Sequence, residues 1–154
     1  EAALYDLFDG KVMALCEVEK SNWQLFDRAL SIVKALNMRV KMMQPSDHDL
    51  HTAYVSHLSH VSSFMLGKTV LEIEKDEAQI FDLASTGFAS TVRLAKSDAQ
   101  MWCPIFLENK DNVLKALNEY IKNLEAFRTL IETEQSEALT QSIHEANYIR
   151  KILK

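Results

Sequence analysis

The segment of residues 112–131 constrains the fold most strongly, because its apolar residues recur at alternating spacings of four and three. This spacing places them on one stripe of an α-helix that packs lengthwise along another helix. The stripe consists of Val113, Leu117, Tyr120, Leu124, Phe127 and Ile131. Three heptads are compatible with either an ordinary amphipathic core helix or a helix at a dimer interface.

The composition of the whole chain also favours helices. The 154 residues include only 3 Gly and 2 Pro, and 47% are hydrophobic, which is enough for a core without disulfides or metals. Cys16 and Cys103 stand far apart among apolar neighbours. They are expected to be buried, reduced thiols of a cytoplasmic protein.

The charge pattern excludes some classes of partner. A net charge of -5 disfavours a nucleic-acid surface, which needs clustered Lys and Arg. No apolar run approaches the length of about 20 residues that a membrane span needs, and no signal-peptide pattern is present. We therefore expect neither a nucleic-acid nor a membrane partner, and an anionic ligand would have to be held by local cations.

The opening residues predict a strand, a helix and a second strand. Short apolar runs at residues 11–18 and 38–43 flank a segment with apolar residues at helical spacing. Parallel strands joined in this way need a larger sheet. Because the chain also begins with Glu1 rather than Met, we expect residues 1–44 to be the end of a preceding α/β domain and residues 45–154 to form an all-helical domain.

Local signals predict the helix boundaries of the second part. Ser46 to Asp49 resembles a capping box that starts a helix, and Ser97-Asp98 is a second start signal. The expected segments are a helix from Ser46 to about Gly67, a helix or bent continuation over residues 68–84, a turn at Thr86-Gly87, a helix with Pro104 in its first turn, and a last helix over residues 136–153.

Four of the five histidines, His48, His51, His57 and His60, fall within 13 residues of one predicted helix. At about 100° per residue, His60 shares a polar face with Asp49 and Ser56, whereas His57 falls within the apolar arc. No two of these histidines are four residues apart, as two zinc ligands on one helix would be, so no metal site is expected. We expect Ser56 and His60 to contact a ligand, and His57 to be either a core residue or a further ligand contact.

Arg93 and Trp102 are further candidates for a binding site. Arg93 stands between apolar neighbours, and a buried or half-buried guanidinium needs an acidic partner. That partner is either internal, with Asp98 and Glu108 as the candidates, or a ligand carboxylate. Trp102 is a core residue unless it borders the pocket, where its indole N–H would reach a polar ligand.

The order and spacing of these motifs resemble prephenate dehydrogenases over nearly the whole chain. The motifs are His48-Asp49, Ser56-His57-Leu58-Ser59-His60, Gly87-Phe88, Arg93-Leu94-Ala95, Met101-Trp102 and Asn109. Two features depart from the family pattern: Ser59 stands where Pro is common, and Val92 separates Thr91 from Arg93.

The resemblance implies a mainly α fold, a helical dimerisation domain preceded by the strand-helix-strand remnant of a Rossmann-type domain. It implies NAD(P)-dependent oxidative decarboxylation of prephenate to 4-hydroxyphenylpyruvate, with NAD or NADP bound mainly by a separate N-terminal domain, and a homodimer. The implied substrate-binding residues are His48, Ser56, His57, His60, Arg93 and Trp102, with no catalytic residue and no activity in residues 1–154 alone. Alternatives are an arogenate dehydrogenase, a non-catalytic helical dimerisation module, or a metal-dependent hydrolase that uses His48 and Asp49.

Overall fold

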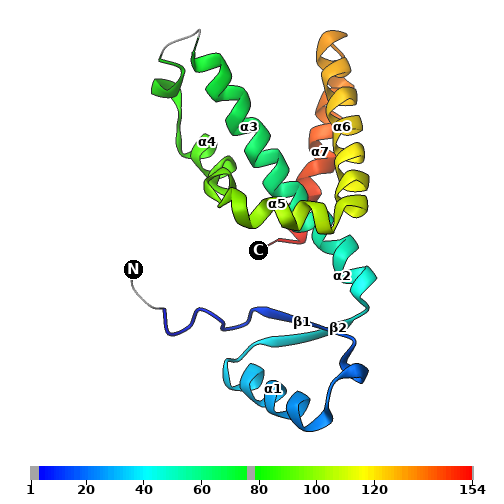
Figure 1. Ribbon diagram of the computed structural model, residues 1–154. Coiled ribbons are helices and arrows are strands. Elements are labelled where there is room, and N and C mark those ends of the chain that lie inside the picture. Colours follow the sequence, from blue (N-terminus) through cyan, green and yellow to red (C-terminus); the bar gives the residue numbers. More distant parts are fainter. Residues whose placement is uncertain (1–3, 76–78, 154) are drawn as a thin grey trace. The chain divides into compact units, whose positions relative to one another are not determined.

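The computed structural model describes residues 4–75 and 79–153, and the chain divides into two compact units, Glu1–Ser59 and His60–Lys154. Most of the described residues lie in helices (Figure 1). Within the described ranges, none of the helices is both long and apolar enough to cross a membrane. The mainly helical fold class expected from the sequence is therefore confirmed.

The first unit begins with the predicted strand, helix and strand. Strand β1 (Val12–Cys16) pairs in parallel with β2 (Arg39–Met43), in a register that runs from Val12 opposite Arg39 to Cys16 opposite Met43. The short 3-10 helix η1 (Val18–Lys20) and the helix α1 (Trp23–Ala35) connect them (Figure 1). Helix α1 starts at Trp23 because the side chain of Asn22 accepts hydrogen bonds from the backbone N–H groups of Gln24 and Leu25.

This two-stranded sheet is small for a stable α/β unit. Among the described residues no third strand joins it, so each strand has an outer edge without a ladder partner. Apolar side chains of α1 are also exposed, with Trp23 at 73% and Ile32 at 62%. Both observations agree with the expectation that this strand-helix-strand unit packs in a larger sheet. The domain boundary at residues 44 and 45 stays a prediction.

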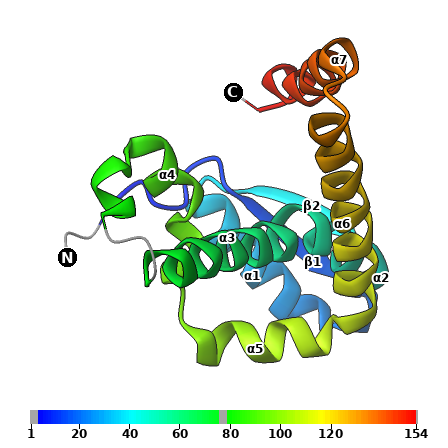
Figure 2. The ribbon, with the colours of Figure 1, turned by 90° about the horizontal axis from the view of Figure 1, so that it is seen from above.

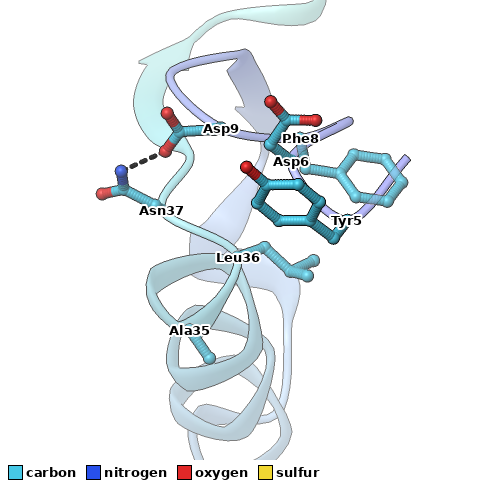
Figure 3. A pocket seen from close by; sticks show the side chains of 7 residues that line it. All are labelled: Tyr5, Asp6, Phe8, Asp9, Ala35, Leu36 and Asn37. Atoms are coloured by element: carbon cyan, nitrogen blue, oxygen red, sulfur yellow. Dashed lines mark hydrogen bonds between the residues drawn. The ribbon is translucent and has the colours of Figure 1, made fainter.

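Residues 4–10 lie against the end of α1 and form a shallow hollow of about 370 Å³ (Figure 3). The backbone N–H of Gly10 donates to the carbonyl of Asn37 at 2.9 Å, and the Asn37 side chain donates to Asp9. Gly10 adopts a φ of +64°, the left-handed conformation in which glycine has no steric penalty. These bonds fix the entry into β1.

Helical backbone then begins at Pro45 rather than at Ser46. Helix α2 (Pro45–Thr52) is followed directly by the π-helical segment η2 (Ala53–His57) and by helix α3 (Leu58–Glu74). The predicted capping box is wrong, because Pro45 occupies the first helical turn and Gln44 precedes it as a cap without a side-chain bond to the described helix. The predicted end near Gly67 is wrong, and the predicted alternative, a continuation beyond it, holds as far as Glu74, where α3 ends.

The rest of the second unit contains one helical hairpin and several short helices. These elements are η3 (Ile80–Leu83), α4 (Thr86–Thr91), η4 (Arg93–Lys96), α5 (Ala99–Glu108), α6 (Lys110–Glu132), α7 (Ser136–Ala146) and η5 (Asn147–Lys151). Thr86-Gly87 starts α4 instead of forming the expected turn. Pro104 lies inside α5 rather than in its first turn, because the Asp98 cap starts this helix at Ala99.

Helices α6 and α7 pack against each other as a hairpin (Figures 1 and 2). The predicted stripe of α6 is buried only near the start of the helix, where Val113 is 8% exposed. Further along, Leu124 is 50% and Ile131 56% exposed. The second half of the stripe therefore presents an apolar face that the described part of the chain does not cover.

The two cysteines do not share the buried environment that the sequence suggested. Cys16 is half-buried in β1, whereas Cys103 is exposed on α5, and both are free thiols. The expectation of a buried thiol is therefore wrong for Cys103.

Substitutions at two glycines should have opposite effects on stability. A Cβ at Gly67 would meet only the Ala95 Cβ, at an ordinary contact distance of 3.5 Å. Gly67→Ala should therefore raise stability by about 0.5–1 kcal/mol, because alanine favours a helix interior. Gly10→Ala has open space but requires a positive φ, and should lower stability by about 1–2 kcal/mol. Thermal melting of both variants checks this, and a lower midpoint for Gly67→Ala would contradict it.

Candidate functional site

His60 and Trp102 form a stacked pair in the second unit. Their ring centroids lie 3.4 Å apart with an interplanar angle of 25°. Trp102 is 7% exposed, and Phe106 and Phe64 extend the cluster, with Phe106 centred 5.4 Å from the Trp102 ring. Helix α3 supplies His60 and α5 supplies Trp102, so the packing of these helices fixes the plane of the imidazole.

The π-helical turn changes the helix geometry on which the placement of the histidines was based. The backbone N–H of Leu58 donates to the carbonyl of Ala53, five residues earlier, so this turn contains one extra residue. Each residue after the turn is rotated relative to a regular helix. A helical wheel drawn at about 100° per residue therefore does not apply beyond Ala53, and the shared face of Asp49, Ser56 and His60 stays a prediction.

The other candidates on this segment belong to the first unit. His57 is 9% exposed and lies at the end of the π-helical turn, and Ser56 is half-buried beside it. His48 is half-buried, and its Nδ1 lies 3.0 Å from Asp49 Oδ1. Within the described ranges, no three His, Cys, Asp or Glu side chains gather in a way that could hold a metal ion.

Arg93 is exposed at the start of η4, so the expectation of a buried or half-buried guanidinium is wrong. It forms no ion pair with any described residue. Of its two predicted internal partners, Asp98 instead accepts a hydrogen bond from the backbone N–H of Gln100 at 2.8 Å as the cap of α5, and Glu108 is exposed. The side chain of Arg93 is therefore available to an external anion.

The backbone around Arg93 is held by Ser63 of α3. Ser63 Oγ donates to the carbonyl of Thr91 at 2.9 Å and accepts from the N–H of Ala95 at 3.2 Å. The sequence did not predict this role of Ser63. Its hydrogen-bond partners are 28 and 32 residues away in the chain, so no local pattern signals them.

Two hollows differ in the ligand that they suit. One, of about 390 Å³, lies between α3 and α5 and is lined by apolar side chains, among them Phe64, Trp102 and Phe106. These ring faces suit an apolar or cyclic ligand. The hollow in Figure 3 contains the carboxylates of Asp6 and Asp9, which would repel an anion.

The chain's residues do not fit the phosphates of a dinucleotide. Such a site needs a glycine-rich turn between a strand and a helix, with glycines two and three residues apart. The three glycines of this sequence are Gly10, Gly67 and Gly87. Residues 1–154 therefore do not contain a glycine-rich phosphate loop of this kind.

A family model, described as prephenate dehydrogenase, dimerization domain, matches residues 44–145. The chain belongs to this family. The prephenate dehydrogenase of Bacillus subtilis is 30% identical over 138 residues, which cover 90% of this chain and 37% of that protein. The cyclohexadienyl dehydrogenase of Zymomonas mobilis is 31% identical over 117 residues, 75% of this chain and 40% of that protein. These matches confirm the resemblance inferred from the motifs.

Solved structures agree with this family assignment. Prephenate dehydrogenase from Aquifex aeolicus, in complex with hydroxyphenyl propionate and NAD+, superposes with a TM-score of 0.86 at 32% identity, over 98% of this chain and 53% of that one. Arogenate dehydrogenase from Synechocystis, at 24% identity and a TM-score of 0.77, shows the same fold. The chain thus spans between about a third and a half of the length of these relatives.

The cap of α5 should contribute measurably to stability, because this helix carries Trp102. Asp98→Ala removes the bond to the Gln100 N–H and should lower the free energy of unfolding by about 1 kcal/mol. Asp98→Asn keeps an acceptor oxygen and serves as the matched control. Urea titrations measure both, and equal losses in the two variants would contradict the capping role.

Proposed function

We propose that this chain forms the substrate-binding and dimer-forming part of a prephenate dehydrogenase. The observation that supports this most directly is the exposed guanidinium of Arg93, which has no acidic partner among the described residues. It lies in the same unit as the stacked rings of His60 and Trp102. A cation and a group of aromatic faces suit an anion that carries a six-membered ring.

Prephenate has these features, since it carries one carboxylate on its ring and one on its side chain. The proposed reaction removes a hydride to NAD or NADP, releases the ring carboxylate as carbon dioxide, and leaves 4-hydroxyphenylpyruvate. The residues of this chain bind and orient the substrate, and none of them is proposed to be catalytic. The planar fork of Arg93 would hold one carboxylate through two hydrogen bonds.

The remaining proposed contacts rest on different grounds. His60 and Trp102 are proposed to contact the substrate from the second unit, where they form the aromatic cluster. His48, Ser56 and His57 are proposed as substrate-binding residues on the family resemblance. The phosphates of NAD or NADP are proposed to be held by a separate nucleotide-binding domain, and a cytoplasmic location is part of the same proposal.

Arogenate is the alternative substrate. It is the aminated relative of prephenate and carries the same two carboxylates, so the role of Arg93 would be the same for either compound. The match to a cyclohexadienyl dehydrogenase keeps this alternative open. Turnover of purified enzyme with each compound separates them.

Replacing Arg93 tests the proposed function. In the enzyme that contains this chain, Arg93→Ala should raise the KM for prephenate by about ten- to hundredfold, because a charge-assisted pair is lost. The melting temperature should change little, since Arg93 forms no ion pair with the described residues. Steady-state kinetics and thermal melting measure the two effects, and an unchanged KM would contradict the proposal.

The same variant identifies the bound carboxylate. Hydroxyphenyl propionate, the ligand of the A. aeolicus relative, has a side-chain carboxylate but none on its ring. If Arg93 holds the ring carboxylate, Arg93→Ala should weaken the binding of prephenate but not the binding of hydroxyphenyl propionate. If Arg93 holds the side-chain carboxylate, the variant should bind both compounds more weakly. Arg93→Lys, which keeps the charge without the fork, is the matched control.

The exposed half of the α6 stripe supports a homodimer as part of the proposal. Leu124 and Ile131 are half-exposed, and Phe127 is 36% exposed. An apolar stripe of this kind is stabilised when a second helix covers it. A two-fold interface would bury the same stripe on both copies.

A charge placed on this stripe should dissociate the dimer. Leu124→Glu would bury a carboxylate in the proposed interface, so the variant should sediment as a monomer at micromolar concentration. Asn123→Glu adds the same charge at the exposed neighbouring position and should remain dimeric. A wild-type enzyme that sediments as a monomer would contradict the interface.

A further inference from the structure

Ser63 makes a connection between helices that the substrate-binding proposal does not use. Its side chain lies inside the second unit at 2% exposure. The hydroxyl bonds to two backbone groups, the Thr91 carbonyl at 2.9 Å and the Ala95 N–H at 3.2 Å. These groups lie two residues before and two residues after Arg93, so a single hydroxyl holds both sides of the arginine.

The backbone at Arg93 needs such support. Helix α4 ends at Thr91, Val92 is irregular with φ of -91° and ψ of 9°, and η4 begins at Arg93. Helix ends leave backbone groups without partners from their own helix. The Thr91 carbonyl gains the Ser63 hydroxyl as a donor, and the Ala95 N–H shares its bond between Val92 and Ser63.

Helix α3 also lies beside this segment one turn further along. Gly67 lies one turn after Ser63, and a Cβ built there would meet the Ala95 Cβ at 3.5 Å. One turn before Ser63, the same helix carries His60, which is stacked on Trp102. Helix α3 therefore carries the imidazole of His60 and also holds the backbone on both sides of Arg93.

We propose that Ser63 is a positioning residue, which fixes Arg93 relative to His60 so that both groups meet one substrate. This inference rests on the proposed role of Arg93. Ser63 has no contact with the substrate in this proposal and acts only through the backbone of residues 91–95. Loss of its hydroxyl lets that segment move and weakens the grip of Arg93 on the carboxylate.

A double-mutant cycle in the complete enzyme tests the coupling. Ser63→Ala should raise the KM for prephenate by about tenfold, as for the loss of one or two buried hydrogen bonds, with a smaller change in kcat. The KM for the nucleotide should not change. In the Arg93→Ala background, Ser63→Ala should add little further, because the residue through which it acts is gone.

Two other variants complete the experiment. Thr69→Ala removes a hydroxyl on the same helix that donates, within the described residues, to the α3 carbonyl of Met65 at 2.8 Å. This variant should leave both KM values unchanged. If Ser63→Ala does not fold, Ser63→Cys keeps the side-chain volume with a weaker hydrogen-bonding atom and should show the same coupling.

The outcomes separate this inference from the function on which it rests. A normal KM for prephenate in Arg93→Ala would overturn the substrate clamp itself. A raised KM in Arg93→Ala, together with a Ser63→Ala effect of the same size in both backgrounds, would overturn only the positioning role. A melting temperature that falls without any change in KM for prephenate would also overturn it, since Ser63 would then serve packing alone.

Discussion

The packing of α3 against α5 through the stacked rings of His60 and Trp102 is the contact on which the candidate site depends. The two rings are 3.4 Å apart, and one of them is almost fully buried. A second contact of α3, the bond pair of Ser63, holds the segment that carries Arg93. Helix α3 thus contacts both the Trp102 ring of α5 and the segment that carries Arg93.

The net charge of the chain limits how an anionic ligand can be attracted to Arg93. The chain has a net charge of -5, so attraction of an anion cannot come from the overall charge. It has to come from a local group whose charge is not neutralised by a neighbour. Arg93 is one of the described cations that satisfy this condition, and it lies in the same unit as the stacked rings of His60 and Trp102.

Sequence patterns were least reliable at the ends of helices. Ser46 and Thr86-Gly87 carry residue types typical of caps and turns, yet the helices start at Pro45 and at Thr86. Gly67 resembles a helix end, but α3 continues through it to Glu74. At the start of α2, Pro45 in the first turn outweighed the local preference for a serine cap.

The sequence by itself determined the strand-helix-strand opening, the long α6 helix and the family, because periodicity and motif spacing are properties of neighbouring residues. Tertiary structure decided where the candidate side chains lie. The π-helical turn at Ala53–His57 departs from the regular helix on which the placement of His60 was based, and the guanidinium of Arg93 is exposed. A regular helical wheel cannot represent a π turn. The sequence also does not show that the hydroxyl of Ser63 will bond to backbone groups 28 and 32 residues away.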